Sequence, residues 1–213
     1  MKGKNLRRVA GVVVGFLALV GVGASATHYV YEPANEGFLE YPAIVFLHVV
    51  FGSLYLAFAG FQFVGRVRSG RPGYHYWAGR ALVSTGVVVG ATGLFMGLVI
   101  PFSGWTERVY IGVFGTLFLV ALVKGFVHIR AGRVALHREW MIRAFAVALA
   151  FATMRVIFIP ALAIVDDPTD EQITTLSASS FMAAFVLHAL LAEVWIRLTR
   201  RTSIPKIPAS KAA

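Results

Sequence analysis

The chain has 213 residues, of which 58% are hydrophobic and 14% are charged, and its mean hydropathy is +0.73. A soluble domain is about half apolar and about one quarter charged, so this composition excludes an ordinary soluble protein and predicts one that lies in a lipid bilayer. The chain has no cysteine, which excludes disulfides, iron–sulfur clusters and thiol nucleophiles.

Six stretches of the sequence are long and apolar enough to cross a membrane core, which takes about 20 residues of helix. The predicted fold is therefore all-α, with six transmembrane helices in one domain over residues 1–201. Residues 202–213 are expected to form a disordered cytoplasmic tail. The predicted spans are roughly 9–27, 42–65, 80–101, 109–129, 144–165 and 174–197.

The first span has two interpretations that the sequence leaves open. A basic start, an apolar run and the residues Ala24-Ser25-Ala26 also describe a cleavable signal peptide, which would remove residues 1–26. The length of the run favours a retained helix. Gly11 and Gly15 then form a small-residue pair suited to close helix contact.

Basic residues are concentrated before the first span, after the second and fourth spans, and after the last one, and they give a net charge of +10. Acidic residues occupy most of the alternate loops. This is the positive-inside pattern, and it predicts a multi-pass protein of the bacterial cytoplasmic membrane with both termini in the cytoplasm. The charge suits anionic lipid as a partner, and no feature calls for nucleic acid.

Two basic segments, 68–75 and 130–137, share the pattern Arg-x-Gly-Arg-x-x-x-His. Each lies between two apolar runs, which predicts two tandem helical-hairpin repeats at about 42–101 and 109–165. The repeats would form a four-helix core related by a twofold axis along the membrane normal, with one further helix at each end of the chain. Residues 46–90 are expected to superpose on residues 109–153.

In this arrangement His75 and His137 face each other at the cytoplasmic surface. Haem iron accepts histidine from both faces, so one hypothesis is a b-type haem between the two repeats. The alternative is a basic surface that binds lipid phosphates. Four arginines are candidates to bind the haem propionates: Arg71, Arg80, Arg133 and Arg143.

Arg155 lies near the middle of the fifth predicted span, where an arginine is costly and usually faces the bundle interior with a partner. His48, on the second span, is the candidate neighbour. Together they predict a polar cavity for an anionic or amphiphilic ligand, with His188 and Glu193 as further candidates. Glu193 matches Arg143 or Arg80 in depth, so an ion pair is also expected there.

The third span contains Gly86, Gly90, Gly93 and Gly97, two small-residue pairs whose expected role is close packing of neighbouring helices. No metal-binding motif is present: the sequence lacks a His-Glu-x-x-His helix.

Several of these features resemble one family. The stretches His75-x-x-x-Gly79-Arg80 and His137-Arg138-x-Trp140-Met141-x-Arg143 are similar to the motifs of domain-of-unknown-function family 2306, a group of bacterial membrane proteins. The resemblance covers about residues 42–197 and extends to His48, Arg155 and Ala192-Glu193-x-Trp195. It implies a multi-helix membrane protein and no particular activity. The helical core with histidines is also similar in architecture to cytochrome b561-type proteins, and fold does not imply function.

Three functions remain open. The first is a redox protein that holds haem and exchanges electrons with quinone. The second is a binding or transport-like protein with a ligand near His48 and Arg155. The third is a scaffold that packs against other membrane proteins. The sequence does not decide whether the protein is an enzyme.

Overall fold

The computed structural model describes residues 2–27 and 36–200, and every regular element in these ranges is helical. The prediction of an all-α fold with six helices able to span a membrane is confirmed. The predicted tail at 202–213 lies outside the described residues. The elements are α1 (Lys2–Thr27), α2 (Glu36–Glu40), α3 (Pro42–Ala59), the 3₁₀ helix η1 (Gly60–Phe63), α4 (Gly65–Gly70), α5 (Pro72–Val99), α6 (Gly104–Arg130), α7 (Val134–Ala163) and α8 (Asp170–Arg200).

Prolines and glycines lie at the ends of several helices. Pro42 and Pro72 occupy the first turns of α3 and α5, where the missing N–H costs no hydrogen bond. Gly104 and Gly132 have positive φ, +63° and +72°, which favours glycine in the two tight turns beside α6. Helices α5 and α7 start eight to ten residues before the predicted spans, because polar residues at the membrane surface continue a helix that hydropathy does not detect. His75 and His137 therefore lie in the first turns of helices.

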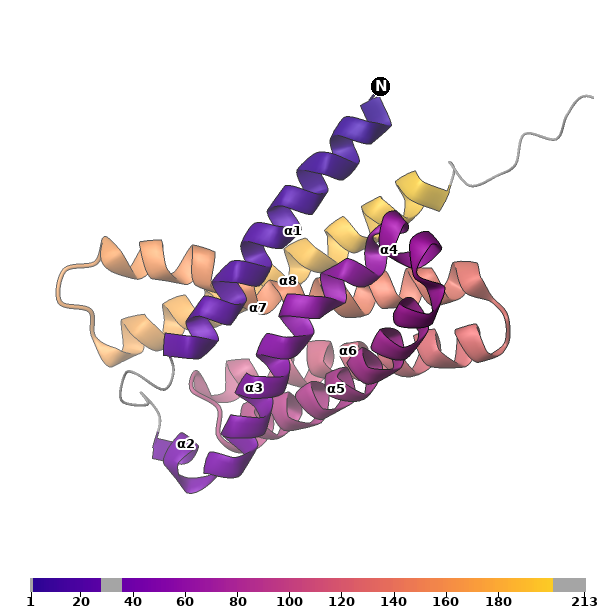
Figure 1. The fold of residues 1–213 in the computed structure, drawn as a ribbon. Coiled ribbons are helices and arrows are strands. Elements are labelled where there is room, and N and C mark those ends of the chain that lie inside the picture. Colours follow the sequence, from indigo (N-terminus) through magenta and orange to yellow (C-terminus); the bar gives the residue numbers. More distant parts are fainter. Residues whose placement is uncertain (1, 28–35, 201–213) are drawn as a thin grey trace, which may run out of the picture.

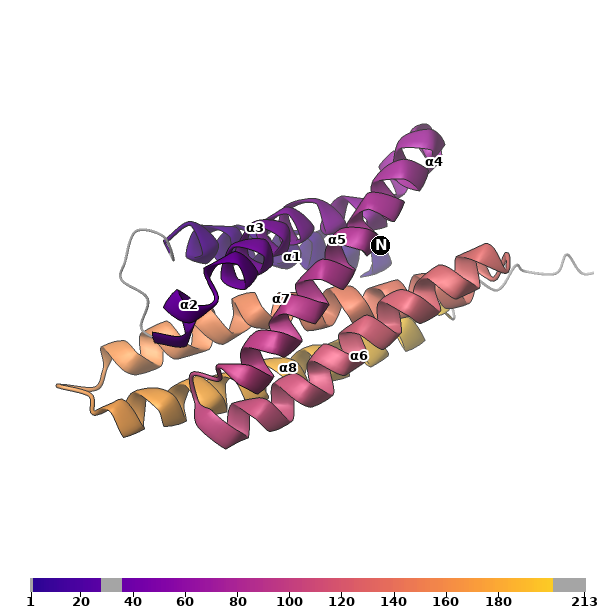
Figure 2. The ribbon, with the colours of Figure 1, turned by 90° about the horizontal axis from the view of Figure 1, so that it is seen from below.

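Figure 1 shows that the first residues of α1, the short helix α4, the α6–α7 turn and the last residues of α8 lie at one end of the bundle. We call this the basic end, because it contains the two Arg-x-Gly-Arg segments. Helix α2, the α5–α6 turn and the α7–α8 connection lie at the opposite, acidic end. Figure 2 shows the same division from below. His75 and His137 are thus at the same end, as expected.

Neighbouring helices pack in the order α3, α5, α6, α7 and α8, and α1 packs against both α3 and α7. The predicted twofold axis would exchange α3 with α6 and α5 with α7, so α3 should contact α7 as closely as α5 contacts α6. In the structure α3 and α7 contact each other little, and α1 packs beside both. The internal repeat is not confirmed and stays a prediction. Helix α1 contacts α3 and α7 at Gly21, where a Cβ would lie 2.5 Å from Leu56 of α3 and 3.4 Å from Ala152 of α7. Gly11 and Gly15, expected to make such a contact, face open space.

Helix α7 contributes the largest share of the core. Its residues Ala144, Ala150 and Ala152 are fully buried, and their small side chains allow α8 and α1 to approach closely. An aromatic cluster fills the space between α6, α7 and α8 toward the acidic end, with ring centroids 4.6–6.1 Å apart. Its members are Tyr110, Phe114, Phe151, Phe181 and Phe185.

The glycines of α5 have the packing role expected of them. A Cβ at Gly90 would lie 2.4 Å from Leu119, and one at Gly97 would lie 2.3 Å from Ile111. The absence of side chains at these positions lets α6 approach the backbone of α5. Gly93 faces α3 instead: a Cβ there would lie 2.9 Å from Cε1 of His48, so this glycine makes room for the histidine ring.

Candidate functional site

His48 is fixed against α5 by its Nδ1 atom. That atom lies 3.2 Å from the Val89 carbonyl oxygen and 3.1 Å from the Thr92 hydroxyl. A carbonyl only accepts hydrogen bonds, so Nδ1 carries the proton and donates it, and Nε2 keeps its lone pair. The side chain of His48 therefore offers one free acceptor within the membrane span.

Arg155 lies near His48, because both contact Phe151 of α7. Its Nη1 donates to the carbonyl oxygen of Phe151, one turn earlier on α7, at 2.7 Å. The Phe151 ring lies edge-on to His48, 6.4 Å between centroids. Arg155 makes no ion pair within the described residues, so most of its five N–H donors have no protein acceptor there. It lies about 12 Å from the end of α7, nearer the acidic end than the sequence suggested, since α7 stops at Ala163.

The other two residues predicted for this cavity lie elsewhere. His188 is buried between α8 and α7, where its Nε2 lies 2.7 Å from the Thr153 hydroxyl. Glu193 accepts two hydrogen bonds from Arg143, at 2.6 Å and 3.1 Å, which is the ion pair expected from their depth. His188 and Glu193 thus have side-chain partners on α7. We call His48 and Arg155 the open pair, because the Nε2 of His48 and most N–H groups of Arg155 have no partner among the described residues.

At the basic end, His75 lies close enough to His137 for charge on one ring to act on the other. His137 donates its Nδ1 proton to the Gly125 carbonyl at 2.8 Å, so its Nε2 is free to accept a bond. Arg143 is engaged by Glu193, and Arg80 donates to the Tyr76 hydroxyl at 2.8 Å. Arg71 and Arg133 are exposed residues just before α5 and α7.

The comparison with known families adds one finding to this geometry. The model of the family described as predicted membrane protein (DUF2306) matches residues 45–196, most of the chain. The protein belongs to the DUF2306 family. No curated protein and no solved structure matches the chain. The resemblance seen in the sequence is thereby confirmed.

Two features of this DUF2306 chain were not predicted from its sequence. Glu139, only 6% exposed, accepts hydrogen bonds from Nε of Arg200 at 2.8 Å and from its Nη2. Matching the depth of the two residues could have predicted this pair, as it did for Glu193. The second feature is Gln62, whose side-chain Oε1 and Nε2 are both buried without a hydrogen-bond partner among the described residues. No pattern in the sequence predicts that the Gln62 amide is buried without a partner.

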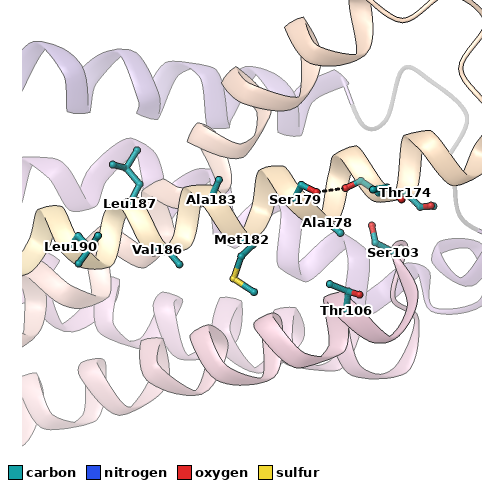
Figure 3. A pocket seen from close by; sticks show the side chains of 11 residues that line it. Ser103, Thr106, Thr174, Ala178, Ser179, Met182, Ala183, Val186, Leu187 and Leu190 are labelled. Atoms are coloured by element: carbon teal, nitrogen blue, oxygen red, sulfur yellow. Dashed lines mark hydrogen bonds between the residues drawn. The ribbon is translucent and has the colours of Figure 1, made fainter.

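A shallow groove of about 850 Å³ lies between α6 and α8 of the DUF2306 chain (Figure 3). Hydroxyl groups line its end near the α5–α6 turn, and apolar side chains line the rest. These hydroxyls include Ser179, which donates to the Thr175 carbonyl at 2.7 Å, and Thr174, which donates to the Asp170 carbonyl at 2.9 Å. The hydroxyl of Ser103, which also lines this end, is buried without a hydrogen-bond partner among the described residues. No charged side chain lines the groove, so we assign it no ligand.

Proposed function

We propose that the protein is a non-enzymatic membrane protein that binds an anionic amphiphile, with the acidic head group at Arg155 and His48. The observation that supports this function is that Arg155 makes one hydrogen bond among the described residues, to a carbonyl of its own helix. A guanidinium stays charged at every accessible pH, so burial cannot neutralise it. A carboxylate or phosphate would accept two parallel hydrogen bonds from it.

His48 would supply the second polar contact. With Nδ1 held by α5, its Nε2 can accept a hydrogen bond from a protonated acid or, once charged, donate one to an anion. The apolar tail of the ligand would lie along the lipid-facing surface. The open pair then recognises the head group, and the membrane itself accommodates the rest.

The test is binding of a defined acid, oleate, to the purified protein, measured by displacement of a fluorescent fatty acid. Charge-assisted hydrogen bonds contribute about 1.5–3 kcal/mol each, so Arg155→Leu is expected to weaken binding by about ten-fold or more. Arg155→Lys should not restore it, since lysine lacks the bidentate geometry. Arg80→Leu, at the opposite end, is the matched control and should bind oleate normally. Equal affinity of Arg155→Leu and the wild type would leave the scaffold function as the better candidate.

A b-type haem between His75 and His137 is the second candidate function, and one contact favours it. The bond from Nδ1 of His137 to the Gly125 carbonyl is the kind that orients a metal-binding histidine through its other nitrogen. The engagement of Arg143 and Arg80 counts against it, because two of the four arginines expected to bind propionates have other partners. A Soret band in the absorption spectrum of the purified protein, lost in His137→Ala, is the outcome that would favour haem.

We further propose that the basic end faces the cytoplasm of a bacterial cell, as the positive-inside pattern predicts. The chain has no cysteine, so single cysteines report orientation without background. Ser69→Cys, in α4, should be protected in whole cells from a membrane-impermeant maleimide, and Asp167→Cys, in the α7–α8 connection, should react. The reverse pattern would contradict the orientation.

A further inference from the structure

Four buried polar atoms near the basic end lack partners among the described residues: Oε1 and Nε2 of Gln62, and the Nδ1 atoms of His75 and His128. An unsatisfied buried polar group costs about 1–3 kcal/mol, and native structures contain few of them. Several such atoms in one place therefore suggest that another molecule supplies the hydrogen bonds.

Gln62 and His75 lie beside the same face of α5. The Oε1 atom of Gln62 is 3.6 Å from the position that a Cβ of Gly79 would occupy, and Gly79 is one turn after His75 on that face. Charge at Arg68 of α4 and at His137 of α7 acts on His75. The polar groups of Gln62 and His75 thus meet beside one face of α5, at the end of the bundle that also holds His137.

An aromatic surface lies beside these groups. Phe63, next to Gln62 in η1, stacks on Phe145 of α7 with centroids 5.4 Å apart and an angle of 28° between the rings. Flat aromatic walls favour a flat ligand by offset stacking.

We propose that Gln62 and His75 bind the head group of a membrane quinone. A quinone carbonyl oxygen accepts hydrogen bonds from the Gln62 amide and from a protonated ring nitrogen of His75, and a quinol hydroxyl donates to the Gln62 carbonyl. The head group is flat and uncharged, which suits neutral polar groups inside a membrane span. Haem held by the two histidines would leave the Gln62 amide without a partner.

The test uses the full chain in phosphatidylcholine nanodiscs and a 1,4-benzoquinone with a decyl tail as the probe. Binding is followed by quenching of tryptophan fluorescence, since Trp77 and Trp140 lie on α5 and α7 toward the basic end. We expect saturable quenching by the wild type and at least ten-fold weaker binding by Gln62→Leu and by His75→Phe. Gly79→Ala, which adds a methyl group against the Gln62 amide without removing a polar group, should also weaken binding.

Two controls separate this site from the rest of the protein. Arg155→Leu, toward the acidic end, should bind the quinone like the wild type, so failure of the anion site leaves this result unchanged. Arg71→Leu removes an exposed charge just before α5 without touching a neutral polar group, and it should also bind normally. The apparent Tm of Gln62→Leu should stay equal or rise, because removing an unsatisfied amide relieves a cost.

Three outcomes would overturn the proposal. The first is a wild type that does not bind the benzoquinone. The second is equal binding by the wild type and Gln62→Leu, which would mean that the unsatisfied atoms serve no ligand. The third is a Soret band in the protein as purified, which would show that haem occupies the space beside His75.

Discussion

The polar groups on the two sides of α7 differ in whether they have hydrogen-bond partners on a neighbouring helix. Toward α8, Thr153 bonds to His188, Arg143 to Glu193 and Glu139 to Arg200. Toward α3, Arg155 has an acceptor on its own helix, and His48 keeps a free Nε2. Satisfied polar groups between helices hold a structure together, whereas unsatisfied ones inside a span indicate a ligand. The comparison therefore separates residues that stabilise the protein from residues that we propose bind its ligand.

The largest expected effect is on the side toward α8. Arg200→Leu leaves the buried carboxylate of Glu139 without its partner. Because the Arg200 side chain is itself 63% exposed, we expect a loss of about 2–3 kcal/mol, less than that of a fully buried pair. Unfolding titrated with SDS measures the loss. The double variant Glu139→Leu with Arg200→Leu should recover most of the stability, because it removes both charges. If the single variant loses less than about 1 kcal/mol of unfolding free energy, the Glu139–Arg200 pair does not stabilise the fold as described.

A smaller effect is expected from Thr153→Val, which removes the hydroxyl partner of buried His188. The cost of an unsatisfied buried atom predicts a loss of about 1–3 kcal/mol, measured in the same titration. Thr92→Val is the matched control, since His48 still donates to Val89 in that variant, and its loss should stay below about 0.5 kcal/mol. If both threonine variants lose the same stability, the two sides of α7 do not differ as described.

The smallest effect on stability is expected from Arg155→Leu. It removes a charge without an ion-pair partner from a membrane span, so the stability should change by less than about 0.5 kcal/mol or increase. Ligand binding, in contrast, should be lost. A loss of several kcal/mol would place Arg155 among the structural residues.

The sequence predicted the six helices because length and hydropathy decide which segments can cross a membrane. It also predicted the Arg143–Glu193 pair, because equal depth on neighbouring helices makes the contact possible. It missed Arg200, which lies at the end of α8 and looks like part of the basic flank. It grouped His48, Arg155, His188 and Glu193 in one cavity because depth alone does not say which face of a helix a residue occupies.

The position of α1 could not be predicted in the same way. The two basic segments indicated a symmetric four-helix core, and the sequence contains no signal that α1 would pack against both α3 and α7. Gly21 makes this contact, whereas the expected pair Gly11 and Gly15 makes none. Cleavage of residues 1–26 would expose Leu56 and Ala152, which contact α1 at Gly21.

The bonds between α7 and α8 also bear on how the protein is made. During synthesis α7 reaches the membrane before α8, and until α8 arrives Glu139 and Arg143, near the membrane surface, lack the partners that α8 gives them. We therefore expect the two helices to leave the insertion machinery as a hairpin, with their charges already matched. A nascent chain that stops after Ala163 should stay bound to that machinery or to a membrane chaperone, and completion of α8 should release it.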